Sequence, residues 1–176
     1  MLLLFIFTQF LWAQNAESIA KNKTSNKEVA KFSNQAIKAY QESAVYKIKD
    51  YYAFLELYAN QKTSDSLKIE IKASIFDLFI NKNVKVFDFV TLENKPIPLE
   101  KLLVKIENKN YKFEILDVES SILASDFWTT KYNLEVIEEN QNCHVEVFST
   151  VIFKPVIKQF GSRAKEVWTL FLSDMK

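Results

Sequence analysis

The fold is decided by residues 40–90, which read YQESAVYKIKDYYAFLELYANQKTSDSLKIEIKASIFDLFINKNVKVFDFV. In the first twenty of these residues, apolar side chains recur three or four positions apart, and neither Pro nor Gly interrupts them. This period is typical of one face of an α-helix. Phe54 and Leu57 widen the apolar surface, so we expect this helix to be covered on more than one side. The predicted face consists of Tyr40, Ala44, Val45, Ile48, Tyr51, Tyr52, Leu55, Tyr58 and Ala59.

A second helix is predicted after the polar break at residues 60–63. Ser64 or Asp65 can cap it, because a short polar side chain accepts a hydrogen bond from the free N–H groups of the first turn. Ile75 and Phe79 are expected to be buried against a sheet, and residues 81–83 end the helix. The apolar positions recur every four residues, at Leu67, Ile71, Ile75 and Phe79.

The rest of the chain is mostly strand-like. Residues 83–90 alternate as a first strand that contains Asp88, and a short third helix follows from Pro98 to Ile106. Four more strands are predicted by period-two alternation, and residues 120–126 are either a loop or a continued strand. The expected class is therefore α+β, with N-terminal helices packed on a curved antiparallel sheet. The later strands span 111–118, 128–138, 143–156 and 166–173, with turns at 93–96, at 139–142 and around Gly161.

Composition indicates a packed globule without an extreme charge. Hydrophobic residues make up 48% of the 176 positions and aromatic residues 14%, which disfavours disorder. The 23 basic and 22 acidic residues nearly cancel, so nothing in the whole-chain balance attracts nucleic acid or an anionic membrane. The single glycine, Gly161, excludes Gly-rich phosphate-binding loops.

The first thirteen residues, MLLLFIFTQFLWA, are almost wholly apolar. They are too short for a membrane span, which needs about 20 such residues, but they suit the apolar region of a secretory signal. A buried terminal segment is the alternative. We expect a signal peptide at 1–16, a flexible lead-in at 17–28 and a single domain at 29–176. The mature protein is then exported to the periplasm or the extracellular space, with no stable membrane span.

The predicted elements follow the order helix, helix, strand, short helix and several long antiparallel strands. This order resembles that of the nuclear transport factor 2-like superfamily. The residues that carry the resemblance are 51–55 in the long helix, the capped helix to Phe79 and residues 86–89 in the first strand. The likeness covers residues 32–175 in element order. It implies a cone-shaped α+β fold in which a curved sheet wraps a long helix; a cystatin-like fold is the competing interpretation.

In enzymes of that superfamily, an Asp in or near the first strand can be a general base and a helix Tyr can donate to the oxyanion. The resemblance therefore makes Asp88 a candidate base, with Tyr51, Tyr52 or Tyr58 as candidate donors. Such a base needs a raised pKa, which burial among phenylalanines can give. The alternative is an ordinary strand carboxylate, exposed or bonded to the backbone, beside tyrosines that belong to the core.

Aromatic residues supply the candidate binding surface, as a cavity lining or as an apolar face of the sheet. Cys143 and His144 are neighbours in a predicted strand, so they point to opposite faces and cannot form a dyad. One Cys and one His also serve zinc poorly, and we expect no metal and no cofactor. The predicted ligand-binding residues are Tyr52, Phe89, Phe113, Trp128, Phe148 and Trp168.

Two functions follow as expectations. The first is an exported, non-catalytic binding or protein-interaction module, whose partner is a small apolar ligand or another protein, with a homodimer through the sheet among the alternatives. The second is a small-molecule isomerase, dehydratase or cyclase that uses Asp88 as its general base. A cavity reached by both Asp88 and a tyrosine hydroxyl would favour the second.

Overall fold

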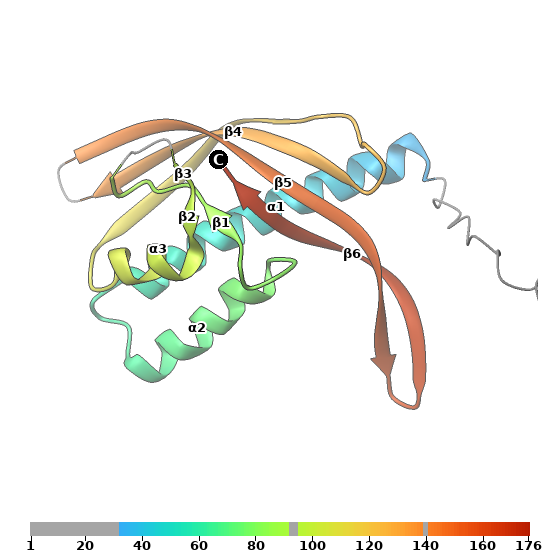
Figure 1. The fold of residues 1–176 in the computed structure, drawn as a ribbon, viewed down its shortest axis with the longest axis horizontal. Coiled ribbons are helices and arrows are strands. Elements are labelled where there is room, and N and C mark those ends of the chain that lie inside the picture. Colours follow the sequence, from blue (N-terminus) through green and yellow to red (C-terminus); the bar gives the residue numbers. More distant parts are fainter. Residues whose placement is uncertain (1–31, 92–94, 139–140) are drawn as a thin grey trace, which may run out of the picture. The chain divides into compact units, whose positions relative to one another are not determined.

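The structure, a computed structural model, describes residues 32–91, 95–138 and 141–176. The predicted signal peptide, the lead-in, and parts of the turns at 93–96 and 139–142 lie outside these residues. Within them, helices pack against one face of a four-stranded antiparallel sheet (Figure 1), so the predicted α+β class is confirmed. None of the helices in the described ranges is long and apolar enough to cross a membrane.

Helix α1 spans Asn34–Ala59 and carries the predicted apolar face. It begins where the Ser33 hydroxyl accepts a hydrogen bond from the Ala36 N–H at 3.2 Å. Leu57 is 50% exposed, so the expectation that it widens the covered face is wrong. It lies two positions from Leu55, about 200° around the helix and thus on the opposite side. The residues buried along α1 are Ala44, Ile48, Tyr51, Tyr52, Leu55, Tyr58 and Ala59.

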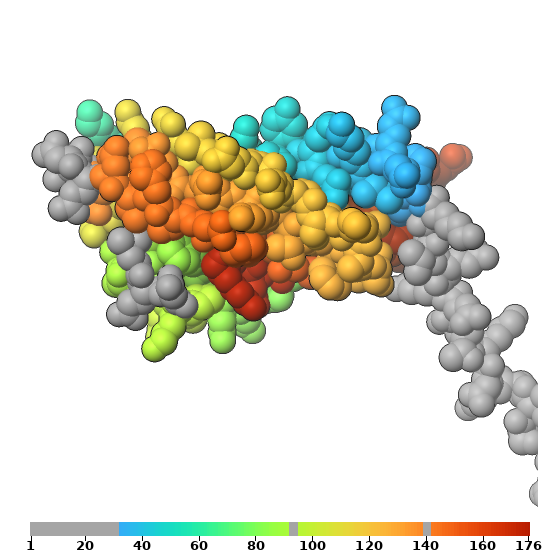
Figure 2. All heavy atoms as spheres, turned by 90° about the horizontal axis from the view of Figure 1, so that it is seen from above, coloured from blue at the N-terminus to red at the C-terminus, as the bar shows by residue number. Residues whose placement is uncertain are grey.

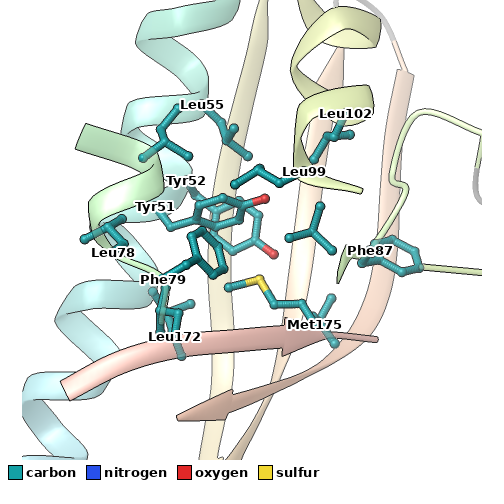
Figure 3. Close-up of a cluster of buried hydrophobic side chains, with 14 of the residues drawn as sticks. Tyr51, Tyr52, Leu55, Leu78, Phe79, Phe87, Leu99, Leu102, Leu172 and Met175 are labelled. Atoms are coloured by element: carbon teal, nitrogen blue, oxygen red, sulfur yellow. The ribbon is translucent and has the colours of Figure 1, made fainter. Parts of the chain in front are cut away.

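Helix α2, Asp65–Asp77, is capped by Ser64, one of the two predicted caps, and Ile75 and Phe79 are buried. The predicted end at residues 81–83 is wrong, because the helix ends at Asp77. Leu67, in its first turn, is 46% exposed instead. After the helix the chain pairs with the last strand: Leu172 donates its N–H to the Leu78 carbonyl, and Ile80 donates to the Leu172 carbonyl, both at 2.9 Å. These contacts join the helices to the sheet in one apolar cluster, in which Tyr51, Phe79 and Leu172 meet (Figure 3).

The predicted strand at 83–90 is wrong in length. Strand β1 spans only Lys85–Val86 and pairs with a short strand β2, Ile97–Pro98. Beyond Val86 the chain turns, because the Asp88 carboxylate accepts hydrogen bonds from the backbone two and three residues further on. Helix α3, Leu99–Ile106, follows β2 and buries the predicted apolar side, namely Leu99, Leu102, Leu103 and Ile106.

The main sheet is a meander in which each strand pairs with the next: β3 Tyr111–Ser120, β4 Phe127–Glu138, β5 Gln141–Phe160 and β6 Arg163–Met175. Residues 121–126 form a loop, one of the two predicted alternatives. Strands β5 and β6 are longer than predicted and continue together beyond the sheet as a hairpin, which we call the arm (residues 155–168; Figure 1). Gly161, with φ of 61°, opens the two-residue loop at its tip, a position that favours glycine.

Candidate functional site

Asp88 lies in the turn after β1, and its carboxylate is almost fully buried. Oδ1 accepts hydrogen bonds from the Val90 N–H at 3.1 Å and the Thr91 N–H at 3.3 Å. Oδ2 accepts a hydrogen bond from the Thr91 hydroxyl at 2.7 Å and forms an ion pair with Lys105 in the last turn of α3. The carboxylate therefore ties the turn to α3.

These contacts determine the pKa of the Asp88 carboxylate. Burial raises the pKa of Asp88, but the hydrogen bonds from Lys105 and Thr91 outweigh burial and leave the pKa below its ordinary value. A general base that works near neutral pH needs the opposite shift. The arrangement therefore suits a carboxylate that stays ionised to hold the turn.

The helix tyrosines are directed into the core. The Tyr52 hydroxyl lies 3.0 Å from the Tyr132 hydroxyl of β4, and both side chains are buried. Burial raises the pKa values of Tyr51 and Tyr52 well above the ordinary range. Burial also raises the pKa of Tyr58, which lines a separate shallow groove of about 220 Å³. Within the described ranges, no hydrogen bond joins Asp88 to any of these three tyrosines.

The six predicted ligand-binding residues occupy three separate places. Tyr52, Phe89 and Phe113 form one cluster, with the ring of Phe113 5.1 Å from Tyr52 and 5.0 Å from Phe89. Trp128 and Trp168 both pack against Phe153 in a second cluster, with ring centroids 6.4 Å and 4.7 Å from that of Phe153. Phe148 projects from the other face of the sheet and is 41% exposed. The structure therefore does not bring these residues together as one cavity lining.

The first cluster borders a groove of about 440 Å³ between α1 and the edge strand β3. Tyr52 and Phe113 line it, but so do the charged residues Lys49, Glu56 and Glu114. Glu56 accepts a hydrogen bond from the Phe113 N–H at 2.7 Å and so occupies the outer edge of β3. A second groove, of about 460 Å³, lies next to it and shares Glu56. Asp88 lines neither groove nor the one beside Tyr58.

Two buried polar atoms have no hydrogen-bond partner in the described part of the chain: Trp128 Nε1, in the second cluster, and Ser149 Oγ, on β5. No three His, Cys, Asp or Glu side chains of the described residues gather as ligands for a metal ion. His144 is exposed, with Nε2 3.6 Å from Glu135 Oε1, and Cys143 is half-buried.

The face of the sheet turned away from the helices carries an apolar patch. Phe127, Ile152 and Phe171 stand directly opposite one another on β4, β5 and β6. Phe148 lies four residues before Ile152 on the same face of β5, with Thr150 between them. We call these four residues the outer patch. Lys131 Nζ lies 6.0 Å from the Phe148 ring centroid and Lys154 Nζ lies 5.4 Å from that of Phe171. Figure 2 looks onto this face, where the yellow and orange strands lie at the surface beside the blue helix α1.

Sequence reasoning missed two features here. No sequence pattern indicated that Lys105 pairs with Asp88, because the two residues are 17 positions apart and on different elements. The outer patch had a partial signal, since Phe148 was a candidate and its period-two neighbours Ile152 and Lys154 share its face. No protein-family model matches this chain, and no curated protein matches it in sequence.

Proposed function

We propose that this protein is an exported, non-catalytic protein-interaction module that pairs with a second copy of itself through the outer patch. The observation that carries the proposal is the outer patch, four apolar side chains on a sheet face that the helices leave uncovered. Phe127 and Phe148 are 43% and 41% exposed there. A solvated face of an antiparallel sheet is normally polar, and exposed apolar patches mark interaction sites. The finer fold class we propose, on element order, is the nuclear transport factor 2-like cone.

The charges around the patch favour a second copy as the partner. A two-fold contact places the same surface on both sides, so unbalanced charges would meet their own kind. Lys131 is neutralised by Glu146, with Nζ 2.7 Å from Oε2. Lys154 sits over the Phe171 ring, where the electrons of the ring face attract the cation. The charge of Lys131 is therefore balanced at the patch, whereas Lys154 stays charged beside it, so a two-fold contact has to bring the phenylalanines together with the two Lys154 side chains apart.

The alternatives have less support. A small apolar ligand is normally held in a concave, largely apolar pocket, whereas charged side chains line the grooves along α1. An isomerase, dehydratase or cyclase would need Asp88 with a raised pKa, and its ion pair with Lys105 lowers that pKa. No observation in the described residues favours catalysis.

Sedimentation equilibrium of the purified chain tests the proposal. We expect the wild type to have twice the mass of one chain, and Phe148→Glu to have the mass of a single chain because it places a carboxylate within the apolar contact. Tyr46→Glu is the matched control, since Tyr46 is 68% exposed on α1 and should leave the dimer intact. A monomeric wild type, or a dimer that survives Phe148→Glu, would refute the proposal.

A further inference from the structure

The arm leaves the body of the protein as a narrow two-stranded ribbon (Figure 1). All residues from 157 to 166 are exposed, including the apolar Ile157 at 78% and Phe160 at 53%. A two-stranded hairpin on its own is marginally stable in water. The chain thus projects apolar side chains at the tip of an element that gains little from its own packing.

The basic residues of the arm gather on one of its faces. Residues directly opposite in a sheet share a face, and so do residues two apart on one strand. Lys158 stands opposite Lys165, and Phe160 stands opposite Arg163 next to the tip. Glu166, opposite Ile157, falls on the other face. The face of the arm that carries the cations consists of Val156, Lys158, Phe160, Arg163, Lys165 and Val167, and it continues through Lys154 and Thr169 into the face of the outer patch.

These cations have no acidic partner among the described residues. Like charges directly opposite each other destabilise a strand pair, and Lys158 and Lys165 are such a pair. No ion pair in the described part of the chain includes Lys158, Arg163 or Lys165. The positive charge of the arm also acts on Lys47 of α1. Burial lowers the pKa of Lys47, the charge of Asp50 raises it, and the charge of Lys158 lowers it further. An anionic partner would relieve this repulsion.

We propose that the arm binds an anionic lipid surface, with Phe160 among the headgroups and Lys158, Arg163 and Lys165 on the lipid phosphates. This goes beyond the pairing through the outer patch and does not depend on it. A lipid surface fits better than a protein because a stable protein contact covers about 800 Å² on each partner, whereas a narrow tip needs to enter the interface by only about 5–10 Å. The whole-chain charge of +1 does not reveal the positive charge of the arm, because the cations gather locally.

Vesicle flotation tests the proposal, with the mature chain from residue 17 and two lipid compositions: pure phosphatidylcholine, and a mixture rich in phosphatidylglycerol. Every variant starts at residue 17, so the apolar residues 1–13 cannot hold the chain on the vesicles. Each basic residue near an anionic surface contributes about 1 kcal/mol, a factor of about five in partition. Lys158→Ala with Lys165→Ala should therefore lower partition into the anionic vesicles about 30-fold. The matched control is Lys82→Ala with Lys101→Ala, which removes the same charge from exposed positions elsewhere.

Phe160→Ser supplies a second readout and should weaken partition while leaving its salt dependence in place. We expect the wild type to prefer anionic vesicles and to lose that preference at high salt. Equal partition into both lipids, or equal partition of the arm variant and its control, would overturn the proposal. So would conversion of a dimer to a monomer by the arm variant, because the arm would then be a protein contact. Circular dichroism of the variants should match the wild type, since their side chains are exposed.

Discussion

Replacing Asp88 by Asn tests whether this carboxylate is structural. Asn keeps the shape and retains one oxygen for the Val90 and Thr91 N–H groups, but it loses the oxygen that accepts from the Thr91 hydroxyl and Lys105. A hydrogen bond to a charged group contributes about 1.5–3 kcal/mol. Lys105 is about a third exposed, and solvent screening reduces its share. We therefore expect the free energy of unfolding to fall by about 1–3 kcal/mol.

The same change should alter the response to acid. The pKa of Asp88 is lowered in the folded state, so its contribution to stability is complete above the unfolded pKa of about 3.9. That contribution disappears as pH falls from there through the folded pKa. Below about pH 4, the wild type should lose stability more steeply than Asp88→Asn.

Urea unfolding at neutral and acidic pH measures both effects. The exposed Asp77 at the end of α2 gives the control, Asp77→Asn, which should change neither quantity. An unchanged unfolding free energy in Asp88→Asn, with the same acid dependence as the wild type, would refute the structural role assigned to the ion pair.

Three further predictions concern the core and the export signal. Ile75→Ala should lower the unfolding free energy by about 2–5 kcal/mol through lost burial and a residual cavity, whereas Leu67→Ala at an exposed position of the same helix should cost far less; equal losses would contradict the assigned helix face. Tyr52→Phe should cost about 1–3 kcal/mol because it leaves the Tyr132 hydroxyl buried and unpaired, and replacing both tyrosines by Phe should cost less than the sum of the single changes if the hydroxyls are coupled. Mass spectrometry of the natively expressed protein should find a mature chain that begins after residues 13–16, and a full-length cytoplasmic product would contradict export.

The helices were predictable because their signals are local. Ser64, one of the two predicted caps, caps α2, and α1 and α3 carry the expected apolar faces; the start of α1 at Asn34, capped by Ser33, was not predicted. The sheet was predictable as an antiparallel meander because alternation gives each strand its two faces. The length of β5 and β6 was not predictable, because Pro155 within β5 favours an earlier end of the strand. In the structure Pro155 stands opposite Trp168 on a free edge of the arm, a position that tolerates proline.

The candidate site was less predictable because it depends on contacts that are distant in sequence. A single side chain, Asp88, turns the chain after Val86 and ends the predicted strand, and its partner comes from α3. The aromatic residues were identified by type, but assigning Phe148 and Trp128 to opposite faces required the actual register. The position of the charges was not predictable either, because the balanced net charge of the chain does not indicate that Lys158 and Lys165 stand opposite each other.

Photo-cross-linking from position 148 is the most direct test of pairing through the outer patch. A photoreactive phenylalanine analogue at Phe148, activated in the purified protein, should give cross-linked peptides that join two chains within residues 127–152 or 163–175. The same analogue at Tyr46, exposed on α1, should give no such product. A mass spectrum with only single-chain products from position 148, or with links from it to the helices of a second chain, would contradict pairing through this face.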